Sequence, residues 1–261
     1  MQDRAGLVVR TLGIDLASQA SQTAACAVVW AAGGARVESI ESGLDDGQLW
    51  ARMDQADLTG IDAPFGWPIP FVEWLVRSHG GDLDSNSGAV VPAWDADHVR
   101  RLRFRLTDYA VRERTGRWPL SVATDLISIV AMRCTGLLQG SGVQDKLGGD
   151  GVVEVYPALA LRVWGLPALG YKGAGNAAMR ERVLRDGLLA RCPWLVMTDA
   201  DIARCIRSDH MLDAFVASLV ARCFGVELVE PIPETDREIA RREGWIVIPT
   251  RDALDGIHLP R

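Results

Sequence analysis

The chain has 261 residues, of which 48% are hydrophobic and 24% charged, and its formal net charge at pH 7 is −6. These values are typical of a globular protein that is long enough to bury a sizeable core. The acidic total excludes a general electrostatic attraction to nucleic acid, so any such binding would need a local basic patch.

The cysteine content, the apolar stretches and the N-terminal residues indicate the cellular compartment of the protein. The five cysteines are scattered, with no CxxC or Cys/His spacing, which argues against a structural zinc site and indicates a reducing environment. No apolar stretch reaches the roughly 18 residues that a membrane span needs. Residues 1–4 lead directly into a strand-like run, so no signal peptide is expected. We therefore expect a cytoplasmic protein without a membrane partner.

The first part of the chain predicts three strands joined by short turns, then a helix and a fourth strand. The strands are expected over residues 7–16, 24–31 and 36–42, the helix over 45–56 and the fourth strand over 58–63. Short connections make the first three strands an antiparallel meander. The helical crossover makes the fourth strand parallel to an earlier one.

The rest of the chain is mainly helical. Helices are expected over residues 71–78, 98–115, 121–138, 158–164, 175–191, 199–206 and 209–224. A Gly-, Asp- and Ser-rich loop is expected over 79–97, a fifth strand over 152–156 and a last short strand over 244–249. This order predicts an α/β fold in a single domain over 1–261: a ribonuclease-H-like mixed five-stranded sheet with flanking helices and a helical insertion at about 69–148. A Rossmann or flavodoxin-like sheet would need helices between the first strands and a Gly-rich loop, and the sequence has neither.

The tripeptide Gly-Ile-Asp occurs twice, ending at Asp15 and at Asp62, and each copy closes a short apolar run. A carboxylate at the end of a buried strand is costly to desolvate unless something compensates its charge. Two such acids at equivalent places indicate neighbouring strands that direct both carboxylates to one point, with a divalent cation as the compensating charge. The alternative is that each aspartate only stabilises a turn.

A third acid lies in a predicted helix. The helical neighbours of Asp213 are Val216, Ala217 and Val220, so its side chain belongs to the apolar face. Asp209 is one turn earlier, where an acid is also favoured by the helix dipole. Like charges four residues apart cost roughly 0.2–0.5 kcal/mol. Because this repulsion destabilises the helix, a functional role explains the pair of aspartates better than a structural one.

Two further residues leave alternatives open. Glu154 lies among apolar residues of a short strand, either on a solvated face or in the site. His210 either orients a substrate or transfers a proton, or it is only a surface or capping residue. Clustered carboxylates are the ligands that Mg²⁺ and Mn²⁺ prefer. Two such ions about 3.5–4 Å apart can activate water and stabilise the leaving oxygen in phosphodiester cleavage.

Six segments carry a family resemblance, and they are GIDLAS (13–18), IDAPFGWP (61–68), RLTD (105–108), EVYPAL (154–159), YK (171–172) and DHMLDAFVASLVAR (209–222). Through them the chain resembles the family catalogued as domain of unknown function 429, which is described as predicted ribonuclease-H-like nucleases. The resemblance covers most of the chain and implies the ribonuclease-H-like fold. It also implies a set of catalytic candidates: Asp15, Asp62, Glu154, Asp209 and Asp213.

The last of these segments is also similar to the closing helix of Holliday-junction resolvases. On that pattern Asp15, Asp62 and Asp213 match the acids of the first strand, the fourth strand and the helix, and they are the expected metal ligands. Glu154 has no obvious counterpart there, and the helix at 45–56 offers no clear site glutamate.

An arginine-rich stretch provides a candidate substrate surface. Between His98 and Arg117 the sequence places Arg100, Arg101, Arg103, Arg105, Arg112, Arg114 and Arg117. On one continuous helix Arg101, Arg105 and Arg112 would share a face, which suits phosphate binding, although a solvated face paired with nearby acids is an equal alternative. The expected substrate-binding residues, which lie in the RLTD, YK and DHM segments, are Arg105, Asp108, Lys172 and His210.

The sequence favours a metal-dependent nuclease that uses Mg²⁺ or Mn²⁺ to hydrolyse DNA or RNA. One alternative is a nucleotide-binding ATPase or kinase of the actin-like superfamily. That site usually needs Asp-x-Gly near the first strand, where this chain has Ala17. The other alternative is a non-catalytic nucleic-acid-binding protein that has kept the fold.

Overall fold

The computed structural model describes residues 8–79 and 94–258 of the chain. Most of the loop expected over 79–97, together with the N-terminal residues 1–7, lies outside the described residues. Within the described ranges, none of the helices combines the length and apolar character that crossing a membrane requires.

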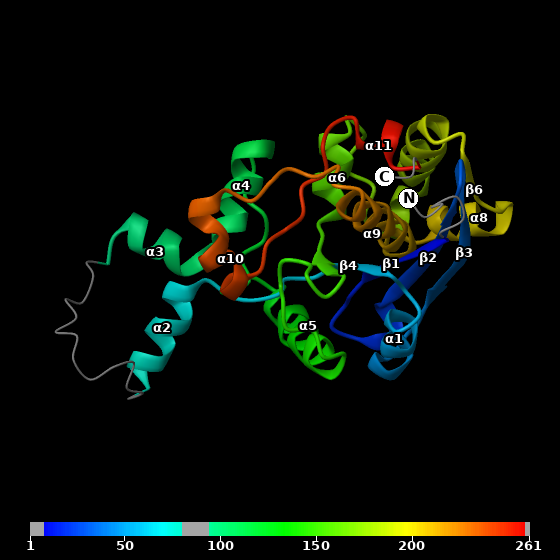
Figure 1. Ribbon diagram of the computed structural model, residues 1–261. Coiled ribbons are helices and arrows are strands. Elements are labelled where there is room, and N and C mark those ends of the chain that lie inside the picture. Colours follow the sequence, from blue (N-terminus) through cyan, green and yellow to red (C-terminus); the bar gives the residue numbers. More distant parts are fainter. Residues whose placement is uncertain (1–7, 80–93, 259–261) are drawn as a thin grey trace, which may run out of the picture.

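A mixed six-stranded sheet lies at the centre of the fold (Figure 1). The strands are β1 (Val9–Asp15), β2 (Ala24–Ala31), β3 (Gly34–Ser42), β4 (Leu58–Asp62), β5 (Val152–Glu154) and β6 (Leu195–Val196). Their order in the sheet is β5-β4-β1-β2-β3-β6. Strands β1, β2 and β3 form the expected antiparallel meander, and β4 is parallel to β1 as its helical crossover predicted. Strand β5 is parallel to β4, and β6 is parallel to β3.

The sheet differs from the expectation at two places. It has six strands and not five, because the two-residue strand β6 adds to the edge at Ala35 and Arg36. The strand expected over 244–249 is not a member of the sheet, and Ile246 makes only a single bridge to Glu154. The backbone N–H of Val247 donates to the carbonyl oxygen of Glu154, whereas that of Ile246 donates to the hydroxyl of Thr107 at 2.8 Å, so the pairing with β5 stays a single bridge.

Helices cover both faces of the sheet (Figure 1). They are α1 (Asp46–Met53), α2 (Ile69–Ser78), α3 (Ala96–Arg103), α4 (Leu106–Thr115), α5 (Ser128–Gly140), α6 (Pro157–Val163), α7 (Ala177–Glu181), α8 (Asp199–Arg207), α9 (Asp209–Gly225), α10 (Arg237–Glu243) and α11 (Ala253–Gly256). Because side chains alternate along a strand, β2 directs Cys26 and Val28 to the core under α6, α8 and α9, and Ala25 and Ala27 to the core that contains residues of α1 and α5.

The expected helix over 98–115 is two helices. Phe104 and Arg105 are extended, and the backbone N–H of Arg105 donates to the carboxylate of Asp108 at 2.8 Å to start α4. The arginines of this stretch therefore do not share one helical face: Arg105 is buried, whereas Arg101 and Arg112 are exposed. The helix expected over 121–138 starts only at Ser128, because side-chain hydrogen bonds hold residues 121–127 in turns.

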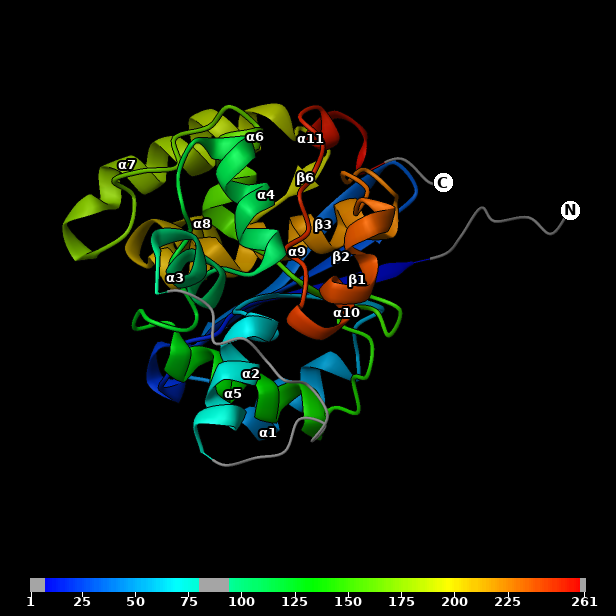
Figure 2. The ribbon, with the colours of Figure 1, turned by 90° about the vertical axis from the view of Figure 1, so that its left-hand side faces the viewer.

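Helices α2, α3, α4 and α10 form a group beside the sheet (Figures 1 and 2). Glu243, at the end of α10, connects two of them: its carboxylate accepts hydrogen bonds from the backbone N–H of Ile69 and of Leu106, both at 2.8 Å. One buried side chain thus satisfies the open N-termini of α2 and α4. Helices α2 to α5 all lie between β4 and β5, where the insertion was expected. The assignment of the whole chain to one ribonuclease-H-like domain stays a prediction.

Candidate metal centre

The two Gly-Ile-Asp tripeptides lie side by side in the sheet. Strands β1 and β4 pair in parallel with Gly13 opposite Gly60, Ile14 opposite Ile61 and Asp15 opposite Asp62. Parallel strands end at the same edge of a sheet, so this register brings both carboxylates to one place.

Helix α9 delivers the third carboxylate because it lies directly on the two glycines. A Cβ at Gly13 would be 1.9 Å from the carbonyl oxygen of Ala214, and a Cβ at Gly60 would be 2.6 Å from that of Ala217. No residue with a side chain fits at either position without moving the helix. We call Gly13 and Gly60 the glycine seam. Asp213 precedes Ala214, so the seam also sets the position of its carboxylate over the strand ends.

Asp15, Asp62 and Asp213 form a carboxylate triad in which one oxygen of each side chain lies within 4.8 Å of the others. Asp213 is only 1% exposed and Asp15 8%. A cation coordinated at about 2.1–2.5 Å keeps its ligand oxygens at most about twice that distance apart. The expected convergence of these three acids is therefore present, at a spacing that suits a shared hard cation.

The triad carries more negative charge than its neighbours compensate. The ammonium of Lys172 lies 2.7 Å from Asp213, and the hydroxyl of Tyr171 donates to the same carboxylate at 2.8 Å. Burial, with a further contribution from Asp15, raises the pKa of Asp213 to about 6 against the opposing effect of Lys172. Burial likewise raises the pKa of Asp62 well above its ordinary value, with Asp15 and Asp213 adding to the effect. One ammonium thus faces three crowded carboxylates, which is the imbalance that a divalent cation corrects.

Hydrogen bonds from two residues, Arg180 and Asp209, hold the segment that carries Tyr171 and Lys172 in place. The guanidinium of Arg180, which is 1% exposed, donates to the carbonyl oxygens of Tyr171 and Gly173, each at 2.7 Å. The carboxylate of Asp209 accepts from the backbone N–H of Gly173 at 2.7 Å. The structure therefore places Asp209 outside the triad, where it anchors the segment next to Lys172.

His210 contacts the triad from its exposed side. Its Nδ1 lies 2.5 Å from a carboxylate oxygen of Asp15, and 41% of its side chain is exposed. This hydrogen bond is the main reason that the pKa of His210 is raised. Because Nδ1 is engaged by Asp15, Nε2 is the ring nitrogen left for a substrate or a water molecule.

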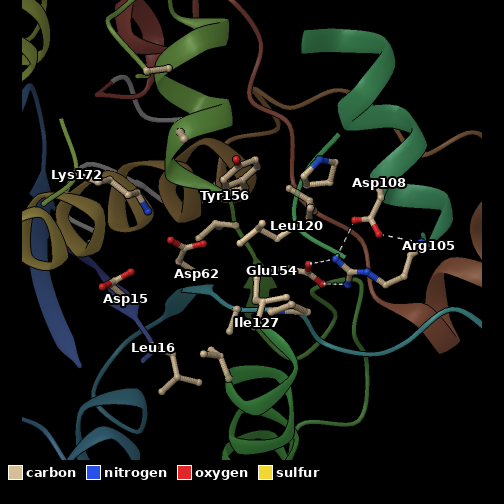
Figure 3. Close-up of a pocket in the computed structure, with 18 of the residues that line it drawn as sticks. Asp15, Leu16, Asp62, Arg105, Asp108, Leu120, Ile127, Glu154, Tyr156 and Lys172 are labelled. Atoms are coloured by element: carbon tan, nitrogen blue, oxygen red, sulfur yellow. Dashed lines mark hydrogen bonds and ion pairs between the residues drawn. The ribbon is translucent and has the colours of Figure 1, made fainter. Parts of the chain in front are cut away.

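Glu154 is not part of the triad and lies across the site, paired with Arg105 (Figure 3). The guanidinium of Arg105 makes a two-pronged contact with the Glu154 carboxylate, at 2.7 and 2.9 Å, and also reaches Asp108 at 3.3 Å. The second oxygen of Glu154 accepts from the backbone N–H of Phe65 at 3.0 Å. Arg105, Asp108 and Glu154 are each at most 3% exposed, so these three residues form a buried charged network.

A cavity of about 490 Å³ joins the two groups. Asp15, Asp62 and Lys172 line one end of it, and the Arg105–Asp108–Glu154 network lines the other (Figure 3). Of the residues predicted for the site, these six share one cavity. Asp213 and His210 contact its acidic end from α9.

Residues 13–238 match the family described as "Protein of unknown function (DUF429)". The chain belongs to this family. No curated protein and no solved structure matches the chain. The matched span of this DUF429 chain begins at the first residue of the glycine seam and includes both strand acids, the charged network and α9.

The donor set of this DUF429 site fits a hard divalent cation, because it consists of carboxylate oxygens in a buried, under-compensated cluster. Sequence reasoning missed Tyr171 and Glu243 as contributors to the site. The signal for Tyr171 was available, since it stands next to Lys172 in the YK segment. Glu243 belongs to a charged helix and gives no signal in the sequence, because its partners Ile69 and Leu106 are far away in the chain.

Proposed function

We propose that this protein is a metal-dependent nuclease with a ribonuclease-H-like fold, in which Asp15, Asp62 and Asp213 hold Mg²⁺ or Mn²⁺ and the substrate is DNA or RNA. The observation that carries the proposal is the convergence of three carboxylates within 4.8 Å: Asp15 and half-buried Asp62 at the ends of two neighbouring parallel strands, and buried Asp213 on the helix that covers them. The three-stranded meander followed by parallel strands, with acids closing the first and fourth strands, supports the fold assignment.

The residues around the triad have suitable roles for phosphodiester hydrolysis. A bound divalent ion would supply Lewis acidity toward the phosphate and lower the pKa of water. Lys172 places a positive charge beside Asp213, where it can contact a phosphate oxygen. In the reaction a water oxygen bonds to phosphorus, the bond from phosphorus to the leaving sugar oxygen breaks, and the proton of the water must reach that oxygen. His210, with Nε2 available, is placed to carry this proton.

The test is an incubation of the protein with Mg²⁺ or Mn²⁺ and a panel of single- and double-stranded DNA and RNA. We expect cleavage that Asp213→Asn lowers at least about a hundredfold, because one ligand of the ion is lost. Asp255→Asn is the matched control, since Asp255 is an exposed carboxylate paired with Arg191 away from the cavity. Calorimetry with Mn²⁺ should show weaker binding to Asp213→Asn and unchanged binding to the control. Unaltered cleavage by Asp213→Asn, or no cleavage of any substrate, would refute the proposal.

A further inference from the structure

The cavity beside the triad is the size of one small ligand. Its volume of about 490 Å³ lies within the range of about 300–1,000 Å³ that is typical of small-molecule sites. A base-paired duplex does not fit such a space, whereas a single nucleotide unit does. If a nucleic acid is the substrate, it must therefore place one unit at a time beside the triad.

The walls between the two charged ends are apolar. Leu16, Ile127 and Val130 line the interior, and Leu120 and Leu169 line the cavity while remaining 61% and 56% exposed. We call Leu120 and Leu169 the apolar lips. Contact with apolar walls does not stabilise the polar phosphate and sugar, but it does stabilise the flat face of an unstacked base. The apolar section thus matches the base and the acidic end matches the phosphate with its cation.

The arginine that lines the far end of the cavity has a buried nitrogen without a partner among the described residues. Arg105 lines the cavity, and its Nε is buried without a hydrogen-bond acceptor among the described residues, although both terminal nitrogens are engaged by carboxylates. A buried donor without an acceptor destabilises the folded protein, and more so on a charged group. A ligand acceptor would remove that destabilisation once the Arg105 guanidinium turned to expose Nε to the cavity. The ring nitrogens and carbonyl oxygens along the edge of a base are acceptors of this kind.

We propose that the cavity binds one unpaired nucleotide, with the base between the apolar walls, its acceptor edge toward Arg105 and its phosphate toward the carboxylate triad. This inference rests on the proposed nuclease function and narrows it. The enzyme acts on a strand end or on a nucleotide turned out of its helix, and a continuous duplex is a poor substrate.

Binding of small probes tests the cavity separately from catalysis. Calorimetry in Ca²⁺ compares the deoxynucleoside 5′-monophosphates with deoxyribose 5-phosphate, which lacks the base. We expect at least one monophosphate to bind at least about tenfold more tightly, because only the base reaches the apolar walls. Leu169→Trp and Leu120→Trp fill the mouth and should remove this difference while Mn²⁺ binding is retained. Leu126→Trp is the matched control, because Leu126 is 92% exposed and does not line the cavity.

The outcomes separate this inference from the proposed function. Base-dependent binding that the lip variants abolish supports the nucleotide cavity, even if no nucleic acid is cleaved and the nuclease proposal fails. Equal binding of all probes, insensitivity to both lip variants, or equally fast cleavage of a covalently closed circular duplex and a single strand would overturn the inference. The last result would leave the nuclease function standing.

Discussion

Replacing Gly13 with alanine tests whether the glycine seam positions α9 over the strand ends. The new Cβ would lie 1.9 Å from the carbonyl oxygen of Ala214, 2.3 Å from the nitrogen of Ser218 and 2.9 Å from the carbonyl carbon of Ala217. All three are backbone atoms, so no change of side-chain rotamer relieves the contacts. Non-bonded heavy atoms prefer separations of about 3.5–4.0 Å. The helix must therefore move away from the sheet by about 1.5 Å.

The expected loss of stability depends on the size of the element that Gly13→Ala displaces. Overpacking typically costs about 1–3 kcal/mol, and here the displaced element is a 17-residue helix with twelve buried residues. We therefore expect a loss of about 3 kcal/mol or more in the free energy of unfolding. For a protein of this size each kcal/mol corresponds to about 2–4 °C, so Tm should fall by about 6–12 °C. Asp213 moves with the helix, and Mn²⁺ binding should weaken as well.

Thermal unfolding in EDTA, followed by circular dichroism, measures the first effect, and calorimetry with Mn²⁺ measures the second. Gly136→Ala is the matched control: Gly136 lies inside α5, and a Cβ there meets no atom within 4 Å. The same substitution should stabilise the protein at that position by about 0.5–1 kcal/mol. If the free energy of unfolding of Gly13→Ala lies within about 0.5 kcal/mol of the wild-type value, the glycine seam does not set the position of α9.

Two further predictions concern the buried charges. The pKa of Asp213 rises from 3.8 to about 6 on folding, so its contribution to stability is fully present below pH 3.8 and is lost as the pH rises through about 6. In EDTA, Tm should therefore fall more steeply between pH 4 and pH 6 in the wild type than in Asp213→Asn, and parallel curves would contradict this. Glu154→Leu leaves Arg105 buried without its main partner and should cost about 3–5 kcal/mol in urea unfolding. The double variant Arg105→Leu/Glu154→Leu should be more stable than Glu154→Leu, and the opposite order would show that the ion pair does not set the cost.

The parts of the fold that follow local patterns could be predicted from the sequence. Short turns between apolar runs gave the antiparallel meander, and a helical crossover gave the parallel β4. The two-residue strand β6 could not be predicted, because it is too short to carry a periodic pattern. At the break before α4, the backbone N–H of Leu106 donates to the carboxylate of Glu243, which is 137 residues away, and no local pattern reveals such a partner.

Some features of the candidate site could likewise be predicted from the sequence, and others could not. The convergence of Asp15 and Asp62 follows from strand register, and the apolar helical neighbours of Asp213 already indicated that it faces inward. Arg105 was expected to bind the substrate and Glu154 to be a catalytic residue, and in the structure the two side chains pair with each other. Asp209 was expected beside Asp213 in the site. Asp209 instead accepts a hydrogen bond from the backbone N–H of Gly173, beside Lys172. The two residues are 36 positions apart, and no sequence spacing reveals such a partner.

The two ends of the cavity are built from different kinds of structure. The three acids come from two paired strands and a helix locked onto them, whereas Leu120 and Leu169 stand in the connections between α4 and α5 and after α6. Connections of this type tolerate replacement and insertion far better than packed elements do. Selectivity could therefore be redesigned by exchanging residues 116–127 or 165–169 while the carboxylate triad and Lys172 are left intact. The same division would allow homologous chains to diverge in what they accept while sharing one chemistry.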